Sequence, residues 1–313
     1  MCAWKVLLTD GLEANGQAIL REQAEVDNKS GISAEELLQI VGDYDAIIVR
    51  GRTKVTPAVF EAAKNLKVVG RAGVGVDNID LNAAKEHKVK VVNSPVATTV
   101  AVAELAVGMM LALVRELPRA DAAMKQEKWL KKEFKGAELF RKTLGVIGFG
   151  RIGSTVARMA RAFEMRILAY DPLISAEDIR ARGGEPVTLD ELLAQSDVIT
   201  LHMPLTPDTR GMINAESFSK MKDGVRLVCA ARGGVIDEAA LLEALNSGKV
   251  AGVALDVFAA EPPVDWTLVK HPRLIATPHI GAQTVEAQER AAEDIAHEVL
   301  AALNGKDLRW RVA

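Results

Sequence analysis

The feature that most constrains this chain is a glycine-rich turn between an apolar run and a helical segment. Leu144–Ile147 has the pattern of a buried strand, and G-x-G-x-x-G follows it as Gly148, Gly150 and Gly153. The first glycine permits a tight turn, the second lets a pyrophosphate approach the backbone, and the third lets the helix pack closely. A helix predicted over Ser154–Phe163 would offer free N–H groups to the phosphates. The turn therefore predicts a dinucleotide site.

An acidic residue stands where such a site needs one. The next predicted strand, Arg166–Tyr170, ends at Asp171, close to the ~20 residues after the first glycine expected for the acid that binds the ribose hydroxyls. A carboxylate at this place repels the 2′-phosphate of NADP. The sequence therefore predicts NAD as the cofactor.

Short β-branched runs alternate with helical segments on both sides of residues 94–142, which indicates parallel sheets built from βαβ units. The predicted helices include Ser33–Val41, Pro57–Lys64 and Leu81–Glu86, the last with Asp80 as its N-cap. Thr284–Leu303 is also helical, and its periodicity does not decide which sheet it covers. The predicted strands are Lys5–Thr9, Ala46–Val49, Lys67–Gly70, Lys88–Asn93, Leu144–Ile147, Arg166–Tyr170, Val198–His202, Val225–Cys229, Val250–Asp256 and Leu274–Thr277. The fold class predicted is α/β, with two doubly wound parallel-sheet domains.

Composition excludes several classes of protein. A net charge of −3 over 313 residues argues against a general nucleic-acid or acidic-membrane binder. With Cys2 and Cys229 as the two cysteines, we expect neither a disulfide framework nor a metal site, and a cytoplasmic location fits. The apolar run after Met1 is too short for a signal peptide. Val96–Leu117 is long enough to span a membrane, but Glu104 within it favours a buried or interface helix.

Three turn-rich segments that follow predicted strands carry residues suited to chemistry on a hydroxy acid. Arg232 can clamp a carboxylate through two N–H groups, His279 can exchange a hydroxyl proton near neutral pH, and Glu261 can hold the imidazole. Taken singly, each has a structural alternative, since loop Arg and Glu residues are mostly solvated and a His is often simply packed. Carboxyl ends of parallel strands line the ligand crevice, so the three together favour a site.

A second glycine cluster, Gly70–Asn78, also follows a strand but lacks the third glycine of a dinucleotide turn. Its N–H groups can form a small anion nest, and an ordinary tight loop fits the sequence equally well.

At these residues the chain resembles the D-isomer-specific 2-hydroxyacid dehydrogenase family. The motifs that carry the resemblance are G-F-G-R-I-G at 148–153, A-R-G-G-V-I-D-E at 231–238, L-D-V-F-A-A-E-P-P at 255–263 and T-P-H-I-G-A at 277–282. Their order and spacing match the family from end to end. The resemblance implies NAD-dependent hydride transfer, with Arg232, Glu261 and His279 as catalytic residues. V-V-G-R-A-G-V-G-V-D-N-I-D at 68–80 is most similar to the branch that oxidises D-3-phosphoglycerate in the first step of L-serine biosynthesis.

The resemblance further implies a Rossmann NAD domain, residues 94–280, inserted in a flavodoxin-like substrate domain, residues 1–93 with 281–313. It implies a homodimer through the Val96–Leu117 helix. It implies cofactor contacts at Gly148, Gly150, Arg151, Ile152, Gly153, Asp171, Met203, Ala230, Asp256, Val74 and Ala282. It implies substrate contacts at Arg50, Arg71, Gly73, Gly75 and Lys131, and it leaves open whether Lys131 comes from the same subunit or from the partner subunit.

The chain departs from the family pattern at Val74, Val96–Thr99, Met203 and Cys229, where polar residues are usual, and these departures bear on the exact substrate. The alternatives are a related glyoxylate, hydroxypyruvate or D-lactate enzyme, and an NAD-sensing corepressor built on the same fold. Because the sequence ends near Ala313, we expect no C-terminal regulatory domain and no feedback by serine.

Overall fold

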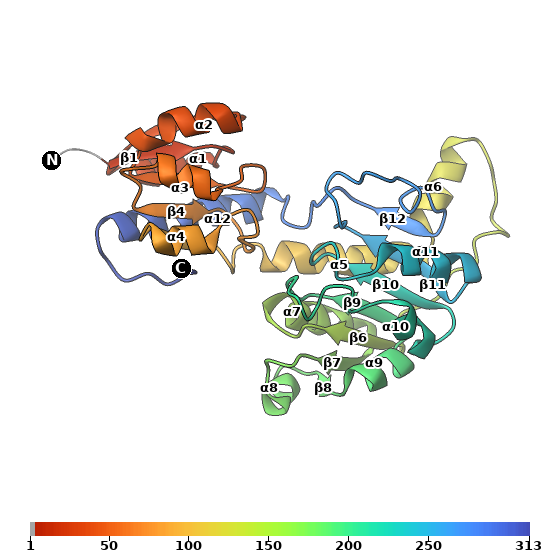
Figure 1. Ribbon diagram of the computed structural model, residues 1–313. Coiled ribbons are helices and arrows are strands. Elements are labelled where there is room, and N and C mark those ends of the chain that lie inside the picture. Colours follow the sequence, from red (N-terminus) through yellow and green to blue (C-terminus); the bar gives the residue numbers. More distant parts are fainter. Residues whose placement is uncertain (1–3) are drawn as a thin grey trace. The chain divides into compact units, whose positions relative to one another are not determined.

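The computed structural model describes residues 4–313, so the expectations about Met1 and Cys2 lie outside the described residues. The chain forms two compact units (Figure 1). Unit 1 holds the residues up to Thr98 together with Ala282–Ala313, and unit 2 holds Thr99–Gly281. The boundaries predicted from the sequence stood at 93/94 and 280/281. The assignment of the substrate and the cofactor to separate units remains a prediction.

Unit 1 is a five-stranded parallel sheet in the order β2-β1-β3-β4-β5, the flavodoxin-like order. Successive strand residues face opposite sides: Leu7 packs beneath α2, α3 and α4, whereas Val6 and Leu8 pack beneath α1 and α12. The elements are β1 Trp4–Leu8, α1 Ala14–Arg21, β2 Ala24–Asn28, α2 Ala34–Ile40, a 3₁₀ turn Val41–Asp43, β3 Ala46–Val49, α3 Pro57–Ala62, β4 Val68–Arg71, α4 Leu81–Glu86, β5 Lys90–Asn93 and α12 Val285–Leu303.

Unit 2 is a seven-stranded parallel sheet in the order β12-β11-β10-β9-β6-β7-β8. This is the Rossmann order with one added edge strand, and the strand order reverses between β6 and β9. The elements are α5 Thr99–Val114, α6 Leu117–Lys125, β6 Thr143–Ile147, α7 Arg151–Ala160, a 3₁₀ turn Arg161–Phe163, β7 Arg166–Tyr170, α8 Ala176–Ala181, β8 Glu185–Pro186, α9 Leu189–Gln195, β9 Val198–Leu201, α10 Ala215–Lys220, β10 Val225–Cys229, α11 Glu238–Ser247, β11 Val250–Leu255 and β12 Leu274–Ala276. The predicted fold class is confirmed.

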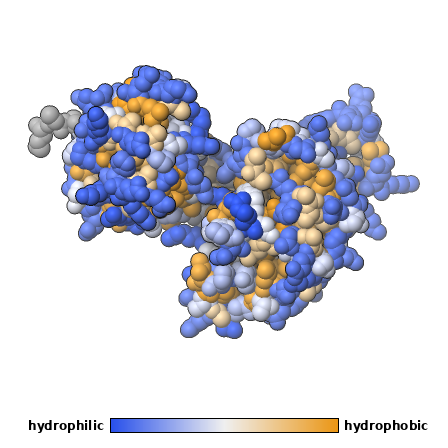
Figure 2. All heavy atoms as spheres, viewed as in Figure 1, coloured by the Kyte–Doolittle hydropathy of each residue, from blue (hydrophilic) through white to orange (hydrophobic). Residues whose placement is uncertain are grey.

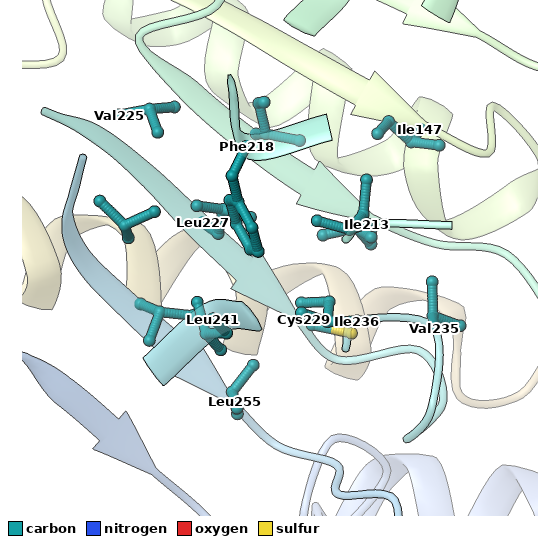
Figure 3. Close-up of a cluster of buried hydrophobic side chains, with 14 of the residues drawn as sticks. Ile147, Ile213, Phe218, Val225, Leu227, Cys229, Val235, Ile236, Leu241 and Leu255 are labelled. Carbon is teal, nitrogen blue, oxygen red and sulfur yellow. The ribbon is translucent and has the colours of Figure 1, made fainter. Parts of the chain in front are cut away.

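Two apolar cores cover the faces of this sheet. One lies under α5 and α7, and the other lies under α9, α10 and α11. Figure 3 shows the second core, in which the thiol of Cys229 lies among aliphatic side chains that include Ile236 and Leu255. Burial raises the pKa of this thiol to about 11, so Cys229 behaves as a packing residue. The apolar neighbourhood is one that accepts a thiol as a small apolar side chain.

Some predicted boundaries are wrong. Lys88 has a left-handed backbone, with φ 58°, so β5 begins only at Lys90. The helix predicted over Val96–Leu117 is shorter in the structure: α5 covers Thr99–Val114, and a second helix, α6, begins at Leu117 after Glu116, whose φ is 51°. The helix predicted from Ser154 begins at Arg151, directly after the glycine turn. Asp80 caps α4 as predicted, because its carboxylate accepts hydrogen bonds from the backbone N–H groups of Asn82 and Ala83.

Neither α5 nor any other helix within residues 4–313 is long and apolar enough to cross a membrane. The surface in Figure 2 is mostly hydrophilic with scattered apolar patches. Large apolar side chains that are exposed in unit 2 include Val100, Leu117, Met124 and Trp129.

Candidate active site

The three predicted catalytic residues follow three adjacent strands of unit 2. Arg232 comes after β10, Glu261 comes after β11, and His279 comes after β12. These strands are neighbours and run parallel, so their following loops lie at the same edge of the sheet. In doubly wound sheets this carboxyl edge is where ligands bind.

Glu261 and His279 are in direct contact. Nδ1 of His279 lies 2.7 Å from Oε2 of Glu261, and Oε1 of Glu261 accepts a hydrogen bond from the backbone N–H of Phe258. The hydrogen bond to Glu261 raises the pKa of His279 above its usual 6.5, against the opposing effect of burial. Burial acts to raise the pKa of Glu261, but the bonds to His279 prevail and hold it below 4.5. The pair therefore favours a charged imidazolium beside a carboxylate.

Asp256 organises the loop that carries His279. This residue directly follows β11, is 1% exposed, and accepts hydrogen bonds from the hydroxyl of Thr277 and the N–H groups of Ile280 and Gly281. Its backbone carbonyl accepts from the N–H of His279, whose φ is 53°. The loop is thereby held in a left-handed turn that a non-glycine residue rarely adopts. The sequence suggested a cofactor contact for Asp256 and gave no sign of this anchoring role.

The loop that carries Arg232 is pressed against the loop that carries Glu261. A Cβ at Gly233 would lie 1.7 Å from the carbonyl oxygen of Phe258, so no larger residue fits there. The N–H of Ala259 also donates to the side chain of Glu238, at 2.7 Å. The charge of Arg232 acts to lower the pKa of both Glu261 and His279, although the bond to Glu261 keeps the pKa of His279 raised overall. All three charged groups therefore share one neighbourhood.

A cavity of about 500 Å³ opens beside this group. Its lining includes Glu261, His279 and Asp256 together with apolar side chains, Phe258 and Trp266 among them. An apolar cavity with a few convergent polar groups is the usual form of a small-molecule site. His202, the histidine that follows β9, is unlike His279, because burial lowers its pKa to about 4 and keeps its ring neutral.

The glycine turn fits a dinucleotide phosphate. Gly148 has φ 87°, and a Cβ on it would lie 2.6 Å from the carbonyl oxygen of His202. A Cβ on Gly153 would lie 2.0 Å from the carbonyl oxygen of Gly148, whereas one on Gly150 would meet nothing within 4 Å. The turn is therefore tightly packed at Gly148 and Gly153, and it is open at Gly150, which is the N-cap of α7. That opening, with Arg151 and Ile152 in the first helical turn, is what a pyrophosphate needs.

The other predicted cofactor contacts of unit 2 lie at the same edge. Asp171 follows β7, Met203 lies just beyond β9, and Ala230 follows β10. The carboxylate of Asp171 accepts from the N–H of Phe149 in the glycine turn and from the N–H of Leu173. Asp171 therefore shapes the turn as well as offering a carboxylate beside it.

The predicted substrate arginines lie at the carboxyl edge of the unit 1 sheet. Arg50 follows β3 and Arg71 ends β4, and these strands are neighbours. Asp10, after β1, binds the N–H of Arg50 and both the N–H and the hydroxyl of Thr53, so it positions this loop. Arg50 also lies 3.6 Å from a carboxylate oxygen of Glu13. Asp10 is a positioning residue that the sequence interpretation did not single out, although it directly follows a predicted strand.

The second glycine cluster forms a tightly held loop. A Cβ at Gly73, φ 142°, would collide with the guanidinium of Arg71. The side chain of Asn93 donates to the carbonyl of Val74, and the N–H of Ser94 donates to the carbonyl of Gly73. Val74, Gly75 and Ala282 belong to unit 1, whereas Lys131 belongs to unit 2 and is exposed. Their contacts with cofactor or substrate remain predictions.

Comparison with known proteins places this geometry in a family. Residues 107–281 match the model for the D-isomer specific 2-hydroxyacid dehydrogenase NAD binding domain. The chain is 48% identical over 308 residues to a D-3-phosphoglycerate dehydrogenase of Synechocystis, covering 98% of this chain and 56% of that protein. A glyoxylate reductase structure from Paecilomyes thermophila matches with TM-score 0.91 and 34% identity, covering 100% and 99% of the two chains. A D-lactate dehydrogenase of Aquifex aeolicus, complexed with NAD and lactic acid, matches with TM-score 0.85 and 34% identity over 96% of each chain.

The chain therefore belongs to the D-isomer specific 2-hydroxyacid dehydrogenase family, and its cofactor is NAD. It spans about half the length of the curated relatives it matches.

Proposed function

We propose that this chain oxidises D-3-phosphoglycerate to 3-phosphohydroxypyruvate with NAD, the first step of L-serine biosynthesis. The observation that carries the reaction type is the 2.7 Å contact between His279 and Glu261 beside Arg232. The observation that favours this substrate is the similarity to D-3-phosphoglycerate dehydrogenases along nearly the whole chain. Arg50 and Arg71, at the ends of adjacent strands, supply the cations that a phosphorylated substrate needs.

The proposed chemistry divides among three side chains. His279 accepts the hydroxyl proton at Nε2, because its Nδ1 is engaged by Glu261. Glu261 stabilises the imidazolium that forms. Arg232 binds the substrate carboxylate and, in the reverse direction, the oxygen on which negative charge develops. When bound, NAD would supply the acceptor for the hydride that leaves the carbon bearing the substrate hydroxyl.

The second candidate is a related glyoxylate or hydroxypyruvate reductase, or a D-lactate-type dehydrogenase. Its support is that the glyoxylate reductase and D-lactate dehydrogenase structures match nearly the whole of this chain, and this chain matches nearly the whole of theirs. The two candidates share the hydride chemistry and differ in whether a phosphate must be bound. A steady-state assay with NAD across D-3-phosphoglycerate, D-glycerate, D-lactate and 2-hydroxyglutarate separates them. Turnover of D-lactate with none of D-3-phosphoglycerate would reject the first candidate.

Arg50→Ala is expected to raise KM for D-3-phosphoglycerate far more than KM for an unphosphorylated hydroxy acid. The reason is that Arg50 follows β3 at the carboxyl edge of the sheet, and its guanidinium would pair with the phosphate alone. Parallel KM measurements on the two substrates test this, with Arg21→Ala on the exposed side of α1 as a matched control. An equal rise for both substrates would mean that Arg50 binds the shared carboxylate or supports the loop.

Asp171→Ser is expected to weaken NAD binding by about 1–3 kcal/mol and to narrow the preference for NAD over NADP. The carboxylate supplies both a charged acceptor for the ribose and a repulsive charge for a 2′-phosphate. Titration of each cofactor by protein fluorescence tests this, with thermal unfolding as a check on the bonds to Phe149 and Leu173. Equal use of the two cofactors by the unaltered protein would disprove the assignment.

Glu261→Gln is expected to move the acidic limb of the kcat/KM profile for oxidation to lower pH. Oxidation needs neutral His279, so activity falls as the pH drops through the pKa of that ring. Glu261 raises this pKa, and glutamine removes the negative charge responsible. The limb of the unaltered enzyme should therefore lie above pH 6.5, the usual value, and the variant's limb should lie at a lower pH than that of the unaltered enzyme. Superimposable profiles would show that His279 does not govern the limb.

We also propose a homodimer formed through the Val96–Leu117 region, which contains α5, in the cytoplasm. Support for the dimer comes from large apolar side chains in or near this region, with Leu117 53%, Met124 54% and Trp129 76% exposed. Patches of this kind mark interaction surfaces in soluble proteins. Sedimentation equilibrium gives the mass in solution, and cell fractionation gives the location.

A further inference from the structure

The loop that carries Glu261 is long and contains no helix. It covers residues 256–273, between β11 and β12, and its middle part, residues 259–267, is mostly exposed. An exposed irregular segment has few packing contacts, so its position depends on hydrogen bonds to neighbouring elements. The distance of 2.7 Å between Glu261 and His279 requires this segment to be held in place.

The helix α11 supplies such a contact through Glu238. Oε1 of Glu238 accepts a hydrogen bond of 2.7 Å from the backbone N–H of Ala259, which stands just before Glu261 in the loop. Hydrogen bonds to an ionised acceptor are shorter and stronger than those between neutral groups. Glu238 is the first residue of α11 and is partly buried. The loop is therefore tied to a helix that lies outside it in the sequence.

The start of α11 is itself firmly held. Asp237 caps the helix, because its carboxylate accepts hydrogen bonds from the N–H groups of Ala239 and Ala240. The N–H of Asp237 donates to the carbonyl of Ile213, and the helix packs through buried apolar side chains. Side chains that rise from a well-fixed helix position a site more precisely than loop residues do. The carboxylate of Glu238 can therefore fix the loop instead of following it.

A short series of contacts leads from Glu238 to the imidazole. The N–H of Ala259 binds Glu238. The N–H of the preceding residue, Phe258, donates to Oε1 of Glu261, and the other carboxylate oxygen of Glu261 lies 2.7 Å from Nδ1 of His279. Adjacent backbone N–H groups of the loop are thus bound to the two glutamates. A shift of the loop away from α11 would move the carboxylate of Glu261 with it.

We propose that Glu238 is a positioning residue, which holds the loop so that the carboxylate of Glu261 stays against Nδ1 of His279. This inference rests on the proposed roles of Glu261 and His279 and adds a third side chain, from a separate helix. The hydrogen bond needs an oxygen acceptor and not a charge, so a glutamine amide can replace the carboxylate. An aspartate is one methylene shorter, so its oxygens do not reach Ala259 from the same helix turn.

The test is an NMR titration of the full chain with ¹³C-labelled histidine, in which the His279 signal is identified by its absence from His279→Ala. Glu238→Ala should lower the pKa of His279 by about one pH unit, because the bond to Glu261 that raises this pKa is loosened. Glu238→Asp should lower it as well, whereas Glu238→Gln should leave it unchanged. Glu243→Ala, at an exposed position of α11, is the matched control and should also leave it unchanged.

An unchanged pKa of His279 in Glu238→Ala would overturn the proposal. A decrease in Glu238→Gln as large as that in Glu238→Ala would also overturn it, because the charge of Glu238 and not its hydrogen bond would then act. If Glu238→Ala does not fold, Glu238→Asp takes its place, since it keeps an acid in the first turn of α11. The titration needs no turnover, so it is independent of the proposed reaction. Normal turnover by His279→Ala would reject the proposed role of His279 without changing the result for Glu238.

Discussion

His279→Ala is expected to lower kcat about 10²–10⁴-fold, the usual range for loss of a general acid–base group. His279 lies in the cavity beside Glu261, and the contact with that carboxylate directs its Nε2 away toward a ligand. The hydrogen bond to Glu261 raises the pKa of His279, so the ring holds an accepted proton more firmly than a free imidazole does. The affinity for NAD should change little, because the glycine turn and α7 are untouched. Single-turnover kinetics and a cofactor titration together measure the two quantities.

His297→Ala is the matched control for this variant, because His297 is an exposed residue of α12 with no part in the site. It should retain full activity. Near-normal turnover by His279→Ala at neutral pH would instead show that another group takes the proton, and the assignment of Glu261 would fail with it.

Asp256→Ala is expected to lower the free energy of unfolding of unit 2 by about 3 kcal/mol or more. The substitution removes the acceptor of three short hydrogen bonds, from Thr277, Ile280 and Gly281, and Asp256 itself is 1% exposed. Each buried donor left unpaired costs about 1–3 kcal/mol. For a unit of this size the loss corresponds to a Tm shift of roughly 6–12 °C. Calorimetry on the full chain measures it.

The same variant should lose most of its activity even where it is folded, because the left-handed turn at His279 depends on this carboxylate. Asp223→Ala is the control, since Asp223 is fully exposed and pairs only with Lys249 among the described residues. That variant should unfold at an unchanged temperature. If Asp256→Ala unfolds no earlier than the control, the loop is held by other contacts and Asp256 acts on the cofactor alone.

Segments with strong local patterns were predictable. The bounds of β3, β7, β10 and α4 follow from apolar runs and from the cap at Asp80, which are local properties of the chain. By contrast, α1 and β2 were not predicted. The sequence of β2 shows no apolar run, because it is an edge strand with alternating charges and mostly exposed side chains. The left-handed residues Lys88 and Glu116 could not be foreseen, since neither is a residue type that usually adopts that backbone.

The sequence by itself determined the glycine turn, the acid after the next strand, and the three loops that carry Arg232, Glu261 and His279. These depend on residue type and short spacing, and the physics that links them to a dinucleotide is local. Only the tertiary structure decided that β10, β11 and β12 lie side by side, which brings Glu261 within 2.7 Å of His279 across 18 residues of sequence. It also decided that the carboxylate of Asp256 binds the N–H groups of the loop that carries His279. The side chain of Arg226 is likewise half-buried, with no hydrogen bond or ion pair to any of residues 4–313. Both outcomes depend on the order of strands in the sheet, a non-local property that no run of neighbouring residues encodes.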